Sequence, residues 1–424
     1  MKPATENSSI RPTSGDSDRL YYGWILVAAF TLVMAVAYGA NFSFSVFLQP
    51  ISDWFGWERA TTSSPLALSL WISGLMAVVM GLMTDRLGPR SVVLLGAIAG
   101  VGGYIVISQT RVLWHLYAGF AITAVNTSSV WTPLVSTTAR WFTRRRVLAI
   151  GIVTGGIGVG QMFMPPLASF LIQKAGWQTA YIVIAILIGV VTLPAVILCR
   201  RPPPAVAEKK EDAGPRKQKN IPITRDLGLA ESVRTPAFWL LFFINIAQAC
   251  VLFMAGMHIA AHAVDTGVSV SAASFTLTFM GGANIAAKLF AGGLADRRGS
   301  TFTLLLFIGA EAVALLILAF AGSYWMFFLA AALMGLGIGG ATPPLVGLVA
   351  EFFGLRSVGA ITGLTGVGWA AGCSLGTVIG DVIYDATGSY FTAFLLGVGL
   401  TIAAGAMAAS LRHPKPPETV QEKG

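Results

Sequence analysis

The chain alternates between long apolar stretches and shorter polar segments. Twelve stretches are each about as long as a bilayer-spanning helix, which takes roughly 20 mostly apolar residues. Their approximate ranges are 23–49, 62–83, 92–108, 113–137, 147–172, 179–198, 237–262, 272–294, 301–321, 324–349, 357–380 and 390–410. This pattern predicts an all-α membrane protein with twelve transmembrane helices.

The longest polar segment divides the twelve stretches into two groups of six. It covers residues 201–236 and contains a run of prolines and a Lys-Lys-Glu-Asp run, which are typical of a flexible connector. We therefore predict one six-helix bundle over residues 23–200 and a second over residues 237–411. Polar tails are expected over residues 1–22 and 412–424.

The composition excludes a soluble globular protein. Hydrophobic residues make up 55% of the 424 residues and charged residues only 11%, against about 25% charged residues in soluble domains. With the N-terminus inside the cell, the outer loops hold only three of the 28 lysines and arginines, namely Arg59, Arg111 and Lys174. This bias predicts cytoplasmic termini and a cytoplasmic linker. The net charge of +9 then reflects membrane topology and not nucleic-acid binding, and the compact loops favour a bacterial inner (plasma) membrane.

The two halves of the chain repeat at one constant offset. A shift of 211 residues places Gly81, Asp85, Arg86 and Gly88 on Gly292, Asp296, Arg297 and Gly299. Such an offset indicates two pseudo-symmetric bundles in parallel orientation. Each aspartate ends one helix near the N-terminus of another, where a carboxylate can bind free N–H groups and pair with arginine. We predict a gating latch between helices at both loops, with a tight turn carrying solvated charges as the alternative.

These loops carry a family resemblance. The segments GLMTDRLGPR and GGLADRRG resemble the loop motif of the major facilitator superfamily, at both expected places. Segments in three further regions are similar to its monocarboxylate porter and oxalate/formate antiporter branch. They are YYGWILVAAF with NFSFSVFLQPI in the first span, RWFTRRRVLAIGIVTGGIGVG leading into the fifth, and HIAAHAVDTGVS at the end of the seventh. The resemblance covers the whole chain. It implies the major facilitator fold, in which two bundles rock about a central cavity and expose it alternately to each side.

Lys288 is a cationic residue inside an otherwise apolar stretch. A cation at the bilayer centre costs about 2.5–3.5 kcal/mol, so we expect Lys288 to face a cavity, a partner or a ligand. In the branch that the chain resembles, a buried arginine commonly holds this place and binds the carboxylate of the substrate. The resemblance thus implies that Lys288 binds substrate, with Asn284 standing where eukaryotic members typically have aspartate. Lysine offers a point charge in place of the bidentate fork of arginine.

Glu311 is a second ionisable residue inside an apolar stretch. It lies about 16 Å from one end of its span, at a depth similar to that of Lys288, so two antiparallel neighbouring helices could pair them. Three interpretations of Lys288 stay open: substrate binding, a static ion pair with Glu311, or snorkelling to water. Glu311 and His258 are candidates for proton coupling, and His258 has an interfacial hydrogen bond as its alternative role. The His258–His262 spacing lacks a third ligand, so no metal site is predicted.

The number of buried cations bears on the charge of the substrate. Oxalate-transporting proteins that resemble this chain typically carry a second lysine in span eleven, where this sequence has Trp369 nearby and no cation. One internal cation favours a singly charged substrate, or one neutralised by a co-transported proton. Other residues of the spans are candidates for lining the cavity, with an interhelical hydrogen bond as the alternative for each: Tyr38, Asn41, Asn126, Trp131, Gln161, Asn245, Gln248 and His258.

The sequence as a whole predicts a secondary active transporter that moves a small organic anion, foremost a monocarboxylate, with or without a proton. No Walker motif or convergent catalytic constellation is present in the sequence, so we expect no ATP hydrolysis, no enzyme activity and no cofactor. The alternative is an antiporter of the same fold for a drug, a sugar or a dicarboxylate. A membrane receptor is disfavoured, and we expect the protein to function as a monomer in the lipid bilayer.

Overall fold

The computed structural model describes residues 14–142, 145–199, 226–256 and 258–411. Over these residues the regular structure is helical. The predicted C-terminal tail, most of the predicted linker, and residues 1–13 of the predicted N-terminal tail lie outside the described residues.

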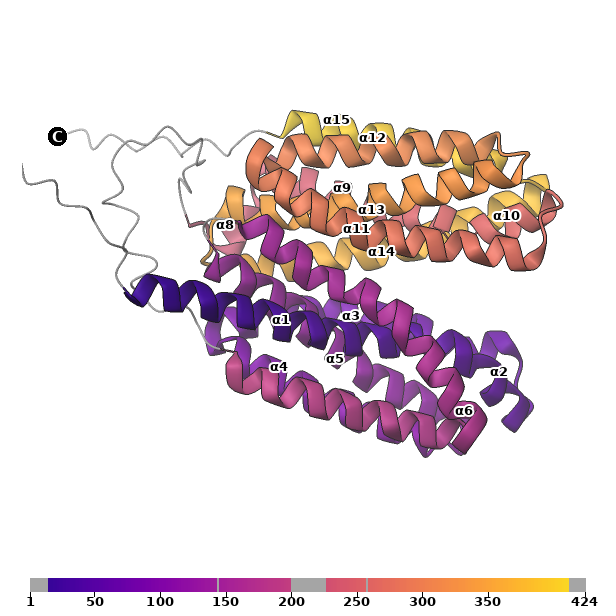
Figure 1. The fold of residues 1–424 in the computed structure, drawn as a ribbon, viewed down its shortest axis with the longest axis horizontal. Helices are drawn as coiled ribbons and strands as arrows, with labels where there is room; N and C mark the ends of the chain where they lie inside the picture. Colours follow the sequence, from indigo (N-terminus) through magenta and orange to yellow (C-terminus); the bar gives the residue numbers. More distant parts are fainter. Residues whose placement is uncertain (1–13, 143–144, 200–225, 257, 412–424) are drawn as a thin grey trace, which may run out of the picture.

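The end of the predicted N-terminal tail, from Ser14, and the first predicted bundle form the helices that are drawn in indigo to magenta in Figure 1. They are α1 (Ser14–Phe42), α2 (Phe44–Phe55), α3 (Arg59–Leu87), α4 (Pro89–Ser108), α5 (Leu113–Trp141) and α6 (Arg146–Leu198). The first predicted span is interrupted at Ser43, between α1 and α2. The fifth and sixth spans are both contained in α6, which breaks at Gly176, where φ is +81°.

The last part of the predicted linker and the second predicted bundle form the helices drawn from rose through orange to yellow (Figure 1). They are α8 (Leu229–Val233), α9 (Pro236–Gly256), α10 (Ile259–Asp265), α11 (Val270–Arg298), α12 (Ser300–Ala319), α13 (Tyr324–Phe353), α14 (Val358–Thr387) and α15 (Phe391–Ser410). The predicted seventh span corresponds to α9 followed by the short helix α10. The expected architecture of two helical bundles with twelve spans is therefore confirmed.

The apolar character of the helices agrees with a protein that crosses a membrane several times. Within the described residues, nine helices are long and apolar enough to do so, and α6 is long enough for two passes. The helices α5 and α11 are not among the nine. Both carry more polar residues, such as Asn126 in α5 and Lys288 in α11, which lower their hydropathy.

The turns between neighbouring helices follow the repeat in the sequence. Gly88 separates α3 from α4 with φ of +94°, and Gly299 separates α11 from α12 with φ of +97°. Both positions need the left-handed backbone region that glycine enters without strain. Pro89 then begins α4, where a missing N–H costs nothing.

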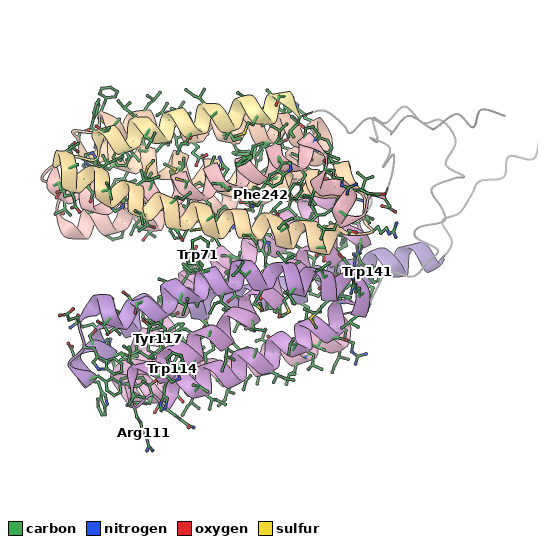
Figure 2. The ribbon with its side chains drawn as sticks, turned by 180° about the vertical axis from the view of Figure 1, so that it is seen from behind. Trp71, Arg111, Trp114, Tyr117, Trp141 and Phe242 are labelled. Atoms are coloured by element: carbon green, nitrogen blue, oxygen red, sulfur yellow. The ribbon has the colours of Figure 1, made fainter. Side chains whose placement is uncertain are left out.

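The two bundles share a core at one end only. We call the end where α1 begins and α15 finishes the terminal end, and the opposite end the distal end. One buried apolar cluster contains residues of both bundles, including Leu134 and Phe142 from the first and Phe238 and Phe353 from the second, and it lies toward the terminal end. Toward the distal end each bundle has a buried cluster of its own. Figures 1 and 2 agree, because the ribbons converge toward the terminal end and diverge toward the distal end.

Candidate functional site

Lys288 lies at the boundary between the bundles. It is carried by α11 of the second bundle, its side chain is 6% exposed, and its Nζ donates a hydrogen bond of 3.3 Å to the carbonyl oxygen of Thr154 in α6. The two backbones approach closely here, since a Cβ added at Gly151 would lie 2.4 Å from the Lys288 carbonyl oxygen. The small residues of α6 thus bring the ammonium group against the first bundle.

The ammonium group of Lys288 has no carboxylate partner among the residues that the structure describes. Its one hydrogen bond is to a neutral main-chain carbonyl, whereas an ammonium group has three donors. A buried charge without a counter-ion is costly. An anion that reached Lys288 would supply both the missing charge and the missing acceptors.

Glu311 does not pair with Lys288, so the ion pair left open by the sequence is wrong for this structure. Glu311 is 0% exposed, and its Oε2 accepts a 2.6 Å hydrogen bond from Nε2 of Gln248 in α9. The reason is that α13 packs extensively against both α11 and α12, which have little contact with each other. Gly339 of α13 lies against Asn284, and Gly337 lies against Glu311, so the α13 backbone separates the two sides.

The other candidate cavity residues fall into different environments. The rings of Tyr38 and Trp131 meet edge to face with centroids 6.3 Å apart, which brings α1 and α5 together. Asn126 is 1% exposed and its Nδ2 donates to the carbonyl oxygen of Gly96 within the first bundle, at 2.8 Å. This contact corresponds to the interhelical alternative for Asn126.

The remaining candidates are spread over both bundles. Asn41, Asn284 and Trp369 are half-buried, and Gln161 is exposed. The His258 ring precedes α10, and it stacks on Tyr390 with centroids 5.0 Å apart. Among the described residues no group of three metal-ligating side chains occurs.

Asp85 joins the two bundles at the terminal end. Its carboxylate forms an ion pair with Arg140 of α5, and it accepts hydrogen bonds from the N–H groups of Gly359 at 3.3 Å and Ala360 at 2.9 Å. These two donors belong to the first turn of α14, whose N–H groups have no acceptor within the helix. Arg140 also donates to the carbonyl oxygen of Leu355, at 3.3 Å from Nε and 3.2 Å from Nη2.

Asp296 makes the matching contact in the opposite direction. Its two carboxylate oxygens accept hydrogen bonds from the N–H groups of Val147 at 3.0 Å and Leu148 at 2.9 Å, in the first turn of α6. Each repeated aspartate therefore binds the start of a helix in the other bundle. The repeat is not complete, because the position of Arg140 corresponds to Glu351, which accepts a hydrogen bond from Ser300.

Sequence reasoning missed Arg140, Thr154 and the pairing of Gln248 with Glu311. Arg140 and Asp85 are 55 positions apart, and Gln248 and Glu311 are 63 positions apart, so no local pattern links them. The sequence signal that existed was weaker: Gln248 is one of the few polar residues in the apolar stretch of α9.

Comparisons with known proteins agree with this architecture. A model of the Major Facilitator Superfamily matches residues 30–264 and 241–424. Monocarboxylate transporter 11 of Homo sapiens is 26% identical over 405 residues, which cover 93% of this chain and 84% of that protein. The oxalate:formate antiporter of Oxalobacter formigenes is 26% identical over 317 residues, which cover 72% of this chain and 71% of that protein. These relatives confirm the branch resemblance drawn from the sequence.

Solved structures show the same fold. A crystal structure of the transporter FucP in the outward conformation superposes with a TM-score of 0.71 at 14% identity, covering 92% of this chain and 99% of FucP. A second structure of FucP, the fucose:proton symporter of E. coli, gives a TM-score of 0.70 with 92% and 98% covered. Because the family match runs over nearly the whole chain and the fold agrees with it, this multi-pass membrane protein belongs to the Major Facilitator Superfamily, whose members are carriers of small solutes and not enzymes.

Proposed function

We propose that the protein is a secondary active transporter that moves a small monocarboxylate across the membrane by alternating access. The observation that carries this proposal is the buried Lys288 ammonium at the bundle boundary, bonded to the Thr154 carbonyl and to no carboxylate in the described part of the chain. An incoming carboxylate would replace the neutral Thr154 carbonyl oxygen as the acceptor and would carry a charge opposite to that of the ammonium group. Hydrogen bonds to charged groups are the stronger kind.

The position of Lys288 links binding to movement. Its backbone touches Gly151 and its side chain touches Thr154, so the cation belongs to the contact between α11 and α6 that rocking must alter. A substrate that binds the ammonium group weakens its hydrogen bond to Thr154, which is one of the contacts between α11 and α6. Differential contacts of this kind are what allow a ligand to shift a conformational equilibrium.

Asp85 and Asp296 are the proposed gate of this transporter. Their carboxylates bind helix starts of the opposite bundle at the terminal end, and these bonds must break for that end to open. Two glycines of the motif let helices of the two bundles approach closely here, with Gly81 of α3 against Gly359 and Gly292 of α11 against Leu148. The rest of the motif consists of Arg86, Gly88, Arg297 and Gly299.

The terminal end is proposed to face the cytoplasm, in a bacterial inner membrane. The support is the excess of lysine and arginine in the segments at that end. The substrate would then enter from the distal side in the present arrangement, where the bundles have separate cores. We propose that one chain suffices, since each six-helix half is present in the same molecule.

A single buried cation favours a monocarboxylate over a dicarboxylate. Helix α14 contains Trp369 near the position of the second lysine that related oxalate transporters typically carry, and α14 itself contains no lysine or arginine. The second candidate function is exchange of dicarboxylates, and the similarity to an oxalate:formate antiporter favours it. A drug or sugar antiporter would have no need of Lys288.

Uptake into proteoliposomes tests the proposal. The purified protein is reconstituted and given a panel of labelled monocarboxylates, with unlabelled oxalate as competitor. We expect saturable monocarboxylate uptake, weak competition by oxalate, and loss of uptake in Lys288→Ala while Lys174→Ala, an exposed lysine, behaves as wild type. Tight oxalate competition would replace the monocarboxylate with a dicarboxylate, and full uptake by Lys288→Ala would refute the binding role.

A further inference from the structure

The Glu311 carboxyl group is buried, and the proposed binding of an anion at Lys288 gives it no role. It is 0% exposed on α12, its Oε2 accepts the bond from Gln248, and its Oε1 has no hydrogen-bond partner. The apolar residues Phe307, Ile308, Ala314 and Leu315 of the same helix are buried around it. A carboxylate has about four acceptor sites, so one donor leaves most of them empty in an apolar interior.

A protonated carboxyl group fits this pocket better. It needs fewer donors, and its own O–H can donate to the amide oxygen of Gln248 while Nε2 of Gln248 donates to the other carboxyl oxygen. Acid and amide would then form a ring of two hydrogen bonds between α12 and α9. The bond from Nε2 of Gln248, at 2.6 Å, is already one half of that ring.

The ionisable groups on the helices packed around Glu311 bond elsewhere. Lys288 of α11 bonds to Thr154, and Glu351 of α13 bonds to Ser300, the first residue of α12. His262 of α10 contacts the carbonyl oxygen of Leu318, about 10 Å further along α12. On α9, Cys250 is a buried thiol close in sequence to Gln248, and α15 contains no charged residue between Phe391 and Ser410.

Charge balance ties Glu311 to Lys288. Among the described residues, Lys288 and Glu311 are the two charged side chains that lie more than about two turns from a helix end, when α6 is counted as two helices that meet at Gly176. A loaded carrier with ammonium, bound carboxylate and protonated Glu311 has no net buried charge. An empty carrier with ammonium and ionised Glu311 has none either. While Lys288 stays charged, an anion without the proton or a proton without the anion leaves one unbalanced buried charge, which is costly at low dielectric.

We propose that the Gln248–Glu311 pair is the proton-binding site of the transporter, and that one proton enters with each carboxylate and leaves with it. This inference rests on the proposed function. The proton adds to a Glu311 oxygen from the side that delivers the anion, and returns to water on the other side. Helix α13 contacts Glu311 through Gly337, and it contacts Asn284, one turn from Lys288, through Gly339. A shift of α13 on binding of the proton or the carboxylate would therefore act on the other site.

Two transport modes separate this role from a static bond. Proteoliposomes preloaded with unlabelled carboxylate measure exchange at equal pH on both sides, and empty ones measure uptake driven by an acidic exterior. We expect Glu311→Gln, which keeps shape and can still bond to Gln248, to exchange at a rate within about twofold of wild type while its response to the pH gradient disappears. A Glu311→Gln protein with the wild-type gradient response would overturn the proposal.

Infrared spectroscopy provides a readout that needs no transport. A buried protonated carboxyl group has its own C=O stretching band. We expect wild type saturated with a monocarboxylate to show this band, and Glu231→Gln, a substitution in the short helix α8, to leave it in place. Gln248→Leu is expected to move this band because the carboxyl loses its amide partner. A spectrum with no such band, or with a band that Gln248→Leu leaves unmoved, contradicts the assignment even if Glu311→Gln fails to fold.

The two proposals fail in different ways. Wild type that transports no carboxylate in either mode refutes the proposed function. Wild type that exchanges carboxylates but ignores the pH gradient leaves the proposed function standing and refutes the proton site.

Discussion

The backbone of Gly151 lies directly against the carbonyl oxygen of Lys288, and a Cβ at residue 151 would lie 2.4 Å from that oxygen. One turn along the same helix, Gly155 has no atom from beyond its own stretch of α6 within 4 Å of where its Cβ would be. The two glycines occur in the same GIVTGG segment, yet only the first is required by a close approach. They form a matched pair for testing how tightly the cation must be held.

Gly151→Ala is expected to slow carboxylate uptake by about tenfold, because overpacking of this kind costs about 1–3 kcal/mol. The added methyl group pushes α6 away from α11 at the level of Lys288. Uptake by proteoliposomes measures the effect, and Gly155→Ala is the control, expected to match wild type. Equal rates in the two variants would show that the close approach at Lys288 is not needed.

Asp85 and Arg140 are expected to act as one unit in stability. Asp85→Ala removes the ion pair and uncaps two N–H groups of α14, so we expect a loss of about 1–3 kcal/mol in unfolding free energy. Arg140→Ala added to Asp85→Ala should then cost less than it does alone, because its partner has already gone. Thermal melting of the purified single and double variants measures the coupling. Strictly additive effects would mean that the ion pair contributes nothing.

Asp296→Ala is expected to favour opening at the terminal end, since the carboxylate binds Val147 and Leu148 only while that end is closed. Spin labels at Leu87→Cys and Phe302→Cys, exposed positions on α3 and α12, would report longer distances between the bundles in this variant. Asp265→Ala serves as the control, because Asp265 bonds to Tyr384 within one bundle. A distance distribution unchanged from wild type would remove Asp296 from the gate.

Asn126→Ala is expected to lower stability without changing the apparent affinity for substrate. The change removes a buried hydrogen bond to the Gly96 carbonyl, and leaving that acceptor unpaired costs about 1–3 kcal/mol. Thermal melting should register this loss, while the KM of uptake stays at the wild-type value. A raised KM in a protein of normal stability would instead place Asn126 at the substrate.

Much of the fold could be predicted because its signals are local. Apolar length determines the spans, and the constant offset between the halves is enough to place Asp85 and Asp296 at equivalent turns. The interruption at Gly176 was also visible, as the junction between the fifth and sixth stretches.

The partners of buried polar groups could not be predicted in the same way. Matching the depths of Lys288 and Glu311 assumed that helices joined by a short loop also lie side by side. The glycines of α13 instead let that helix come between α11 and α12, and Glu311 faces α9. Such a choice depends on tertiary packing of three helices, which no spacing along one of them records.

The apolar cluster shared by both bundles has a consequence for the empty protein. To open the terminal end, that cluster must be split and its surfaces wetted, and the carboxylate bonds at the two helix starts must be lost as well. The unloaded molecule should therefore spend most of its time with the terminal end closed. A carrier with this resting preference would bind the proposed carboxylate from the distal side and open the terminal end only after binding it.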